Sequence, residues 1–174
     1  MEKKSGKPSI VVIGVGNTLF SDEGVGVHVV NQLKRMPLPS NVEVVDCGTN
    51  GIAVLEALDG AEKAVIVDAV SAGGKPGTIY RLTLSEILAM EDRLLKLVSL
   101  HQFDLIAALK LAELTTVYKM PRDIIIVGVE AKSFDLGLGP SEEIKRVIPK
   151  VVEVVLREIE SHGRESQEST PIDH

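Results

Sequence analysis

Three ionisable side chains, Glu23, Asp68 and His101, stand where an α/β enzyme could use them. Glu23 follows a glycine-rich turn, Asp68 ends an apolar run, and His101 begins an apolar helical stretch. Two carboxylates and an imidazole from three separate elements would make a metal site with open positions for water or substrate. This ligand set suits zinc, nickel, manganese or iron. The residue types therefore predict a metal site, although no two of them share a short ligand motif.

Each of the three also has a structural interpretation. Asp22 and Glu23 could cap a helix, which would account for one acid of the pair. Asp68 could close a turn, although a carboxylate at the end of a buried strand is costly unless a partner stabilises it. His101 could bond a neighbouring backbone group at a helix start. Asp104, on the same helical face, could instead orient a metal-bound imidazole.

The glycine-rich turn opens like a dinucleotide-binding fingerprint but does not complete it. Gly14 and Gly16 occupy the first two positions, and Leu19 stands where a third small residue is needed. The acidic pair Asp22 and Glu23 at the helix start would repel a pyrophosphate, which binds at that positive end. We therefore predict no nucleotide site here.

Residues 46–49 (DCGT) follow the second predicted strand. Cys47 has no histidine near it in the sequence, which favours a small buried residue over a nucleophile. Gly48 and Gly51, on either side of Thr49, suggest a backbone shaped for the close approach of another chain.

Apolar runs rich in β-branched residues predict buried strands at residues 10–15, 64–67 and 123–129, and residues 42–46 (VEVVD) predict a further strand. Residues 78–83 alternate apolar and polar side chains, which is typical of a partly exposed edge strand, and Ser85 could cap the helix after it. Helical spacing of apolar residues lies between the runs and after the last one.

Strands that alternate with helices predict an α/β fold: a single three-layer domain with a central, mostly parallel twisted sheet of about five strands and helices on both faces. In such sheets ligands bind beyond the carboxyl ends of the strands. Glu23 and Asp68 both follow strands there. We place the domain at residues 10–161, between a flexible segment at 1–9 and a disordered tail at 162–174.

Composition limits the classes of partner. The chain of 174 residues carries a formal net charge of −6 and has 3% aromatic residues, which disfavours nucleic-acid binding. Its single cysteine allows no internal disulfide and suits a reducing compartment. No stretch approaches the roughly 20 apolar residues of a membrane span. We predict a cytoplasmic protein with no membrane insertion.

Six segments together resemble the hydrogenase maturation endopeptidases, which remove a C-terminal extension from the large subunit of nickel–iron hydrogenases. The first, with its glycine–asparagine turn and acidic pair, is the most specific. The segments are GVGNTLFSDEGVGVHVV (14–30), VDCGTNGIAVLEAL (45–58), VIVDAV (65–70), PGTIYRL (76–82), SLHQFDL (99–105) and IIIVGVEA (124–131). The loop at 132–135 differs from the family's usual loop and leaves the substrate preference open.

The resemblance implies an aspartic-type endopeptidase that activates its partner enzyme by processing it. Glu23, Asp68 and His101 match the family's metal-contacting and catalytic positions. Asp46 matches an aspartate associated with substrate recognition, and we group Gly48 and Thr49 with it. The implied partner is the hydrogenase large-subunit precursor, which supplies the nickel. Zinc or cadmium could occupy the same site adventitiously.

The resemblance also implies a gate, in which nickel already bound to the precursor licenses cleavage. The metal, or a carboxylate acting as general base, would activate water for attack on the peptide carbonyl. Two alternatives stay open. One is an autonomous metallohydrolase that carries its own zinc on the same residues, and the other is a non-catalytic metallochaperone or assembly factor.

Overall fold

Five strands form one sheet in the computed structural model, which describes residues 6–90 and 100–168 and, within them, the side chains of 6–90 and 105–164. The strand order is β2-β1-β3-β5-β4, and only β4 runs antiparallel, beside β5. The strands are β1 (Ile10–Val15), β2 (Val42–Gly48), β3 (Lys63–Val70), β4 (Ile79–Thr83) and β5 (Asp123–Glu130). The predicted α/β fold and the predicted edge strand are confirmed.

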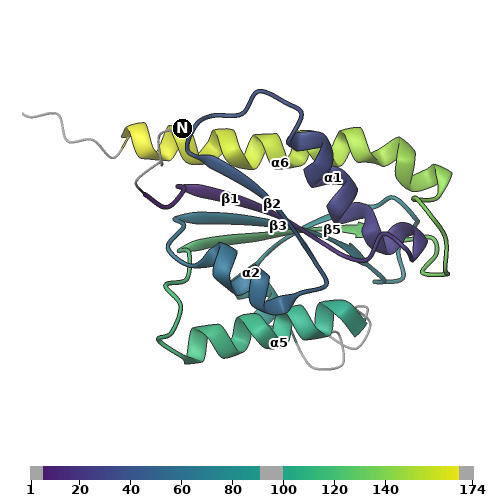
Figure 1. Ribbon diagram of the computed structural model, residues 1–174, viewed down its shortest axis with the longest axis horizontal. Helices are drawn as coiled ribbons and strands as arrows, with labels where there is room; N and C mark the ends of the chain where they lie inside the picture. The colour runs from purple at the N-terminus through teal and green to yellow at the C-terminus, as the bar shows by residue number, and fades with distance from the viewer. Residues whose placement is uncertain (1–5, 91–99, 169–174) are drawn as a thin grey trace, which may run out of the picture.

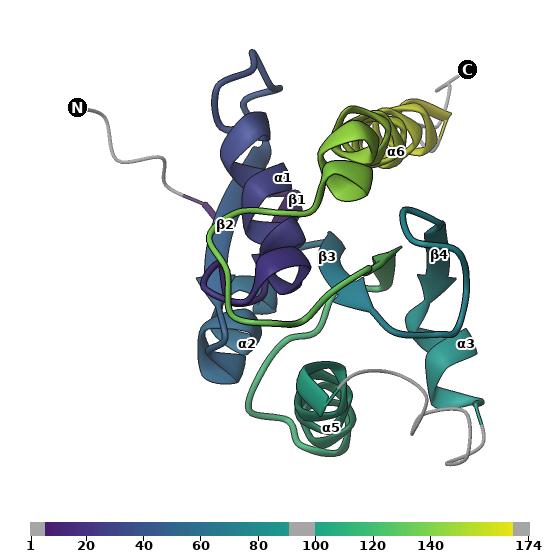
Figure 2. The same ribbon diagram turned by 90° about the vertical axis from the view of Figure 1, so that its right-hand side faces the viewer.

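The helices cover both faces of the sheet. Helices α1 (Val25–Leu33) and α6 (Glu142–Glu168) lie on one face, and α2 (Gly51–Leu58) and α5 (Leu100–Leu114) lie on the other (Figure 1). The short helix α3 (Leu84–Leu88) follows β4, and the single turn η1 (Ser21–Gly24) precedes α1. Figure 2 shows the resulting three layers from the sheet's carboxyl edge.

Apolar side chains alternate between the two faces of the sheet along the central strands, and so contribute to the core on both faces. Val11 and Ile13 of β1 belong to the apolar cluster under α2 and α5, whereas Ile10 and Val12 belong to the cluster under α1 and α6. Strands β1 and β3 are buried along their whole length, as their continuous apolar runs predict. Across the described chain, no helix combines the length and apolarity needed to cross a bilayer.

Some predicted boundaries were wrong. Strand β3 continues past Asp68 to Val70, because it stays paired with β5 as far as Glu130. Thr83, rather than Ser85, caps α3: its hydroxyl accepts from the Glu86 N–H, and the Glu86 carboxylate accepts from the Thr83 N–H in a capping box.

The predicted ends of the domain were also set too far inward. Helix α6 continues to Glu168, so the first part of the expected disordered tail is helical. His162, in that part, lies 3.1 Å from the Glu62 carboxylate. At the other end Lys7 pairs with Asp59 at 2.7 Å, and the Ser9 carbonyl accepts from the Lys63 N–H. Residues 1–5 and 169–174 lie outside the described chain.

Candidate active site

Glycines bring the start of α1 into direct contact with the sheet. A Cβ on Gly14 would lie 2.4 Å from the Gly26 carbonyl oxygen, and one on Gly26 would lie 2.1 Å from that of Val67. Gly16 has a φ of +129°, and a Cβ there would lie 1.9 Å from the Glu23 carbonyl oxygen. The glycines that suggested a nucleotide fingerprint therefore serve close packing, which places η1 and Glu23 against the carboxyl edge.

Glu23 and Asp68 are brought together at this edge, and both are buried. Glu23 belongs to η1 and Asp68 to β3, which η1 contacts. Burial, together with the nearby Glu23 carboxylate, raises the pKa of Asp68 well above its usual range. The Ala69 N–H, 2.8 Å from Asp68 Oδ1, opposes that rise. No described residue donates a hydrogen bond to Asp68 Oδ2. Such a carboxyl is costly for the fold unless a proton or a cation neutralises it.

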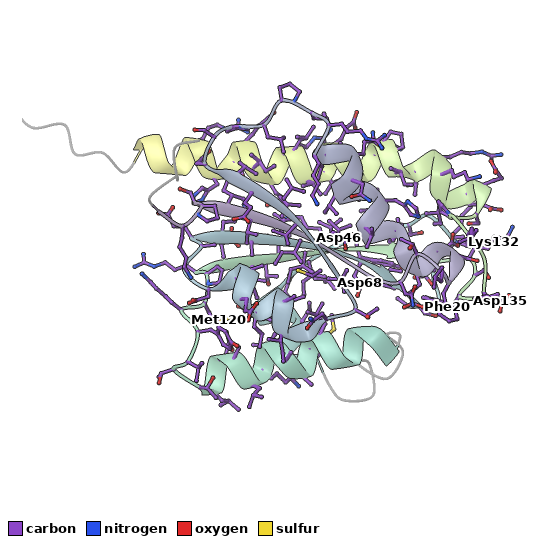
Figure 3. The ribbon with its side chains drawn as sticks, viewed as in Figure 1. Phe20, Asp46, Asp68, Met120, Lys132 and Asp135 are labelled. Atoms are coloured by element: carbon purple, nitrogen blue, oxygen red, sulfur yellow. The ribbon has the colours of Figure 1, made fainter. Side chains whose placement is uncertain are left out.

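His101 is the second residue of α5, and its side chain lies outside the described part of the structure. The helix leads through Met120 into the start of β5, so its first turn lies toward the carboxyl edge of the sheet (Figures 1 and 3). Among the described side chains, no three His, Cys, Asp or Glu form a group that could hold a metal ion. Two of the three predicted ligands are therefore placed together, and the third stays a prediction.

Asp22 has a structural role that the sequence did not reveal. Its carboxylate is fully buried and accepts hydrogen bonds from the N–H groups of Lys132 (2.9 Å), Ser133 (3.1 Å) and Ser141 (2.6 Å). The Ser141 hydroxyl donates a further one at 2.9 Å. Asp22 therefore caps no part of η1 or α1, and instead joins the η1 turn to the segment that leads into α6.

Backbone hydrogen bonds join the same two segments, residues 17–24 and 132–141, which we call the double loop. The Ser21 N–H donates to the Gly137 carbonyl and the Gly137 N–H to that of Leu19, both at 2.9 Å. Ser21 has a φ of +46°, the only positive value outside glycine in the described chain, and its hydroxyl donates to the Asp135 carbonyl. Backbone strain of this kind is typical of functional sites. The turn that carries Glu23 is thus held rigidly.

The end of β2 lies beside this region. Asp46 is exposed, and its Oδ1 accepts from the Gly48 N–H at 2.9 Å. Gly48 has a φ of +50°, and a Cβ there would meet nothing within 4 Å, so its conformation requires glycine and the space beside it is open. Thr49 is exposed next to it. A role for these residues in substrate recognition stays a prediction.

Cys47 is buried beside Asp46, in agreement with the predicted small buried residue. Burial, with a smaller contribution from the Asp46 carboxylate, raises the pKa of the Cys47 thiol to about 11. The thiol is therefore protonated at neutral pH, and a nucleophilic role is disfavoured.

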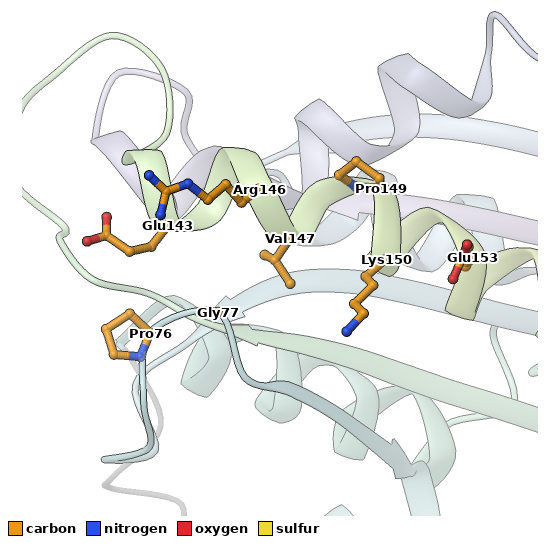
Figure 4. Close-up of a pocket in the computed structure, with 8 residues that line it drawn as sticks. All are labelled: Pro76, Gly77, Glu143, Arg146, Val147, Pro149, Lys150 and Glu153. Carbon is orange, nitrogen blue, oxygen red and sulfur yellow. The ribbon is translucent and has the colours of Figure 1, made fainter.

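A separate shallow groove lies along α6 (Figure 4). It is lined by Pro76, Gly77, Glu143, Arg146, Val147, Pro149, Lys150 and Glu153. None of these residues belongs to the predicted site, and both signs of charge occur along its walls.

Comparisons with known proteins agree on one family. A family model for hydrogenase maturation proteases matches residues 27–158. The hydrogenase 2 maturation protease of Escherichia coli is 33% identical over 159 residues, which cover 90% of this chain and 94% of that protein. The hydrogenase expression/formation protein HupD of Thiocapsa roseopersicina is 35% identical over 168 residues, covering 94% of this chain and 74% of that protein.

Solved structures give the same result. The hydrogenase maturating endopeptidase HybD from Escherichia coli superposes with a TM-score of 0.76 at 30% identity, covering 88% of this chain and 93% of that one. The nickel–iron hydrogenase maturation protease HybD from Thermococcus kodakarensis gives a TM-score of 0.71 at 29% identity, covering 86% and 98%.

Proposed function

Because the chain belongs to the hydrogenase maturation protease family, we propose that it removes the C-terminal extension of a nickel-loaded hydrogenase large-subunit precursor and reads the bound nickel as its recognition element. As a member of that family the chain is a protease. The nickel arrives with the substrate, so the site that receives it must offer ligands without holding a metal of its own.

The Glu23–Asp68 pair carries the proposal. Asp68 is a buried carboxyl with a raised pKa, and its Oδ2 accepts no hydrogen bond from a described residue. A divalent cation delivered to this edge would neutralise both acids and displace any proton that Asp68 retains. His101 would complete the ligand set from α5. In this proposal the three side chains fill coordination positions that the precursor leaves open on its nickel.

Cleavage then needs an activated water beside the anchored peptide. The precursor's nickel, held by the two acids and the imidazole, fixes the scissile bond in the cleft. A carboxyl group that releases its proton to solvent when the cation binds can then act as general base toward that water. A precursor without nickel offers no anchor and is left uncut.

The test is cleavage of the purified precursor, with and without nickel, by the wild type and by Glu23→Gln, Asp68→Asn and His101→Ala. Glu153→Gln, an exposed acid on α6, serves as the control. We expect cleavage of the loaded precursor alone, by the wild type and the control, with circular dichroism unchanged in all variants. Equal cleavage of the metal-free precursor would disprove the nickel gate. A stoichiometric, tightly bound zinc in the purified protein would favour an autonomous metallohydrolase, and an uncut loaded precursor would favour an assembly factor.

A further inference from the structure

The double loop carries four large apolar side chains that are exposed to different degrees, from 37% for Phe20 and 53% for Leu19 to 79% for Leu136. Leu136 and Leu138 flank Gly137, which pairs with Phe20 in an isolated parallel bridge, and Leu19 precedes Phe20. Leu138 is 89% exposed. Single exposed leucines are ordinary, but four on two hydrogen-bonded segments form a surface that is typical of an interaction site. We call these four residues the apolar patch.

The apolar patch adjoins the proposed site along the chain. The Phe20 carbonyl accepts from the Glu23 N–H at 3.0 Å, so the patch begins one turn before the proposed nickel ligand. In Figure 3, Phe20, Lys132 and Asp135 gather beyond Asp68 at one end of the sheet. Phe20 of the patch therefore lies at the same end of the sheet as Asp68.

The patch is held in place before any partner arrives. The Asp22 carboxylate binds Lys132, Ser133 and Ser141, and this fixes the segment that bears the two leucines. An ordered apolar surface loses little conformational entropy on binding, so its burial contributes directly to affinity.

Charge at the border of the patch indicates the chemistry of the partner. Lys132 pairs with Glu143, with Nζ and Oε1 2.7 Å apart, and Asp135, exposed directly before Leu136, places an acidic side chain at the border. The complementary surface is therefore apolar, with room at its edge for a basic group opposite Asp135, and it must lie beside the segment that is cut.

We propose that the apolar patch docks the folded hydrogenase large-subunit precursor, through an apolar surface of the precursor next to its C-terminal extension. The proposal rests on the proposed function and adds a second point of recognition to it. Nickel reports that the precursor is loaded, whereas the patch supplies affinity for the protein and orients the extension toward Glu23 and Asp68.

The chain offers a closely matched control. Leu114 is 85% exposed and lies at the end of α5. After α5 the chain continues to Met120, which lies at the opposite end of the sheet from Phe20 (Figure 3). The test pair is Leu136→Ser with Leu138→Ser, and the control pair is Leu111→Ser with Leu114→Ser, since Leu111 is also exposed.

Two measurements with the nickel-loaded precursor from the same organism test the docking. The first is kcat and KM for cleavage, and the second is the equilibrium Kd in a Glu23→Gln background, where cleavage does not compete. We expect the test pair to raise both KM and Kd by at least about tenfold with kcat nearly unchanged, as for loss of a binding anchor. The control pair should stay within about twofold of its parent. Melting temperatures within about 2 °C of wild type establish that both pairs fold.

Equal KM and Kd values for the two pairs would overturn the docking proposal while leaving cleavage intact. A test pair that only converts a dimer to a monomer in sedimentation, with Kd unchanged, would overturn it in favour of a second copy of the chain. A precursor that binds through the patch but is never cut by the wild type would support docking and overturn the proposed function alone. A precursor neither bound nor cut would overturn both.

Discussion

Two buried carboxyl groups at opposite ends of the central sheet, Glu158 and Asp68, differ in how the chain satisfies them. At the amino end, Lys63 lies 2.9 Å from Glu158 and 3.2 Å from Asp123, and Arg81 also pairs with Glu158. At the carboxyl end, Asp68 is more deeply buried than Glu158, and its Oδ2 accepts no hydrogen bond from any described side chain or backbone group. One end is neutralised by the chain's own cations. For the other end, we propose that the neutralising cation arrives with the substrate.

The pKa shifts follow the same division. Burial works against the ionised form of Glu158, but Arg81 and Lys63 outweigh it, and the pKa of Glu158 is lowered. Burial and Glu23 act in the same direction on Asp68, whose pKa is raised. A paired buried acid is needed by the fold, whereas a carboxyl held at a cost to stability is a candidate for function. Substitutions that remove one carboxyl from each end separate these roles.

Asp68→Asn should have the largest effect, and on activity alone. We expect cleavage of the loaded precursor to fall by at least about 100-fold, as for loss of a ligand or general base. The melting temperature at neutral pH should be unchanged or higher, because a neutral amide replaces a carboxyl that is costly to ionise. Cleavage assays and calorimetry on one preparation measure both. A variant that unfolds would return Asp68 to a purely structural role.

Glu158→Gln should have the opposite profile. Lys63, whose side chain is 4% exposed, would lose its closest anionic partner, and the free energy of unfolding should fall by about 3 kcal/mol. Urea denaturation measures this loss, and kcat for the precursor should not change at temperatures where the variant is folded. The paired change Lys63→Met with Glu158→Leu should recover part of the stability, because it leaves no buried lysine behind. If Glu158→Gln were as stable as the wild type and the double variant were less stable, the ionic network would contribute little to the free energy of unfolding.

The pH dependence of stability should have opposite signs at the two ends. The folded-state pKa of Glu158 is lowered, so its contribution is present above its unfolded value of about 4.3 and is lost as the pH falls through the folded value. The folded-state pKa of Asp68 is raised, so its contribution is full below about 3.9 and is lost as the pH rises through the folded value.

Unfolding curves between acidic and neutral pH check these signs. The stability difference between wild type and Glu158→Gln should shrink on acidification. The advantage of Asp68→Asn over wild type should grow as the pH rises. Parallel curves for both variants would contradict the comparison of the two ends.

The sequence predicted the carboxyl end better than the amino end. Continuous apolar runs placed β1 and β3, and the rule that ligands bind beyond parallel strands pointed to Glu23 and Asp68. The partners of Lys63 are far away in the chain: Glu158 is 95 residues distant, and no local pattern encodes that pair. The run 64–67 also gave too short a strand, because pairing with β5 carries β3 on to Val70.

Asp22 illustrates the same limit within the site. Asp22 joins two distant segments although it is adjacent to Glu23, because the four donors to Asp22 come from residues 110 to 119 positions away. Helix capping was the natural local interpretation, and only the tertiary structure shows that the second segment is the partner. His101 remains a prediction from the sequence and from the family, since its side chain lies outside the described structure.

Ser141→Ala should give the smallest effect and sharpen the comparison, because Asp22 is a buried acid at the carboxyl end that the chain satisfies with neutral donors. The substitution removes the hydroxyl 2.9 Å from Asp22 Oδ2 and leaves the three N–H donors in place. We expect the free energy of unfolding, measured in urea, to fall by about 1 kcal/mol, the usual size of one such bond to a satisfied acceptor. Ser9→Ala serves as the control, since only the Ser9 backbone carbonyl is used, by the N–H groups of Glu62 and Lys63. A loss as large as that of Glu158→Gln would mean that Asp22 depends on the hydroxyl as Glu158 depends on its cations. The distinction between an acid held by distributed backbone donors and one held by ion pairs would then fail.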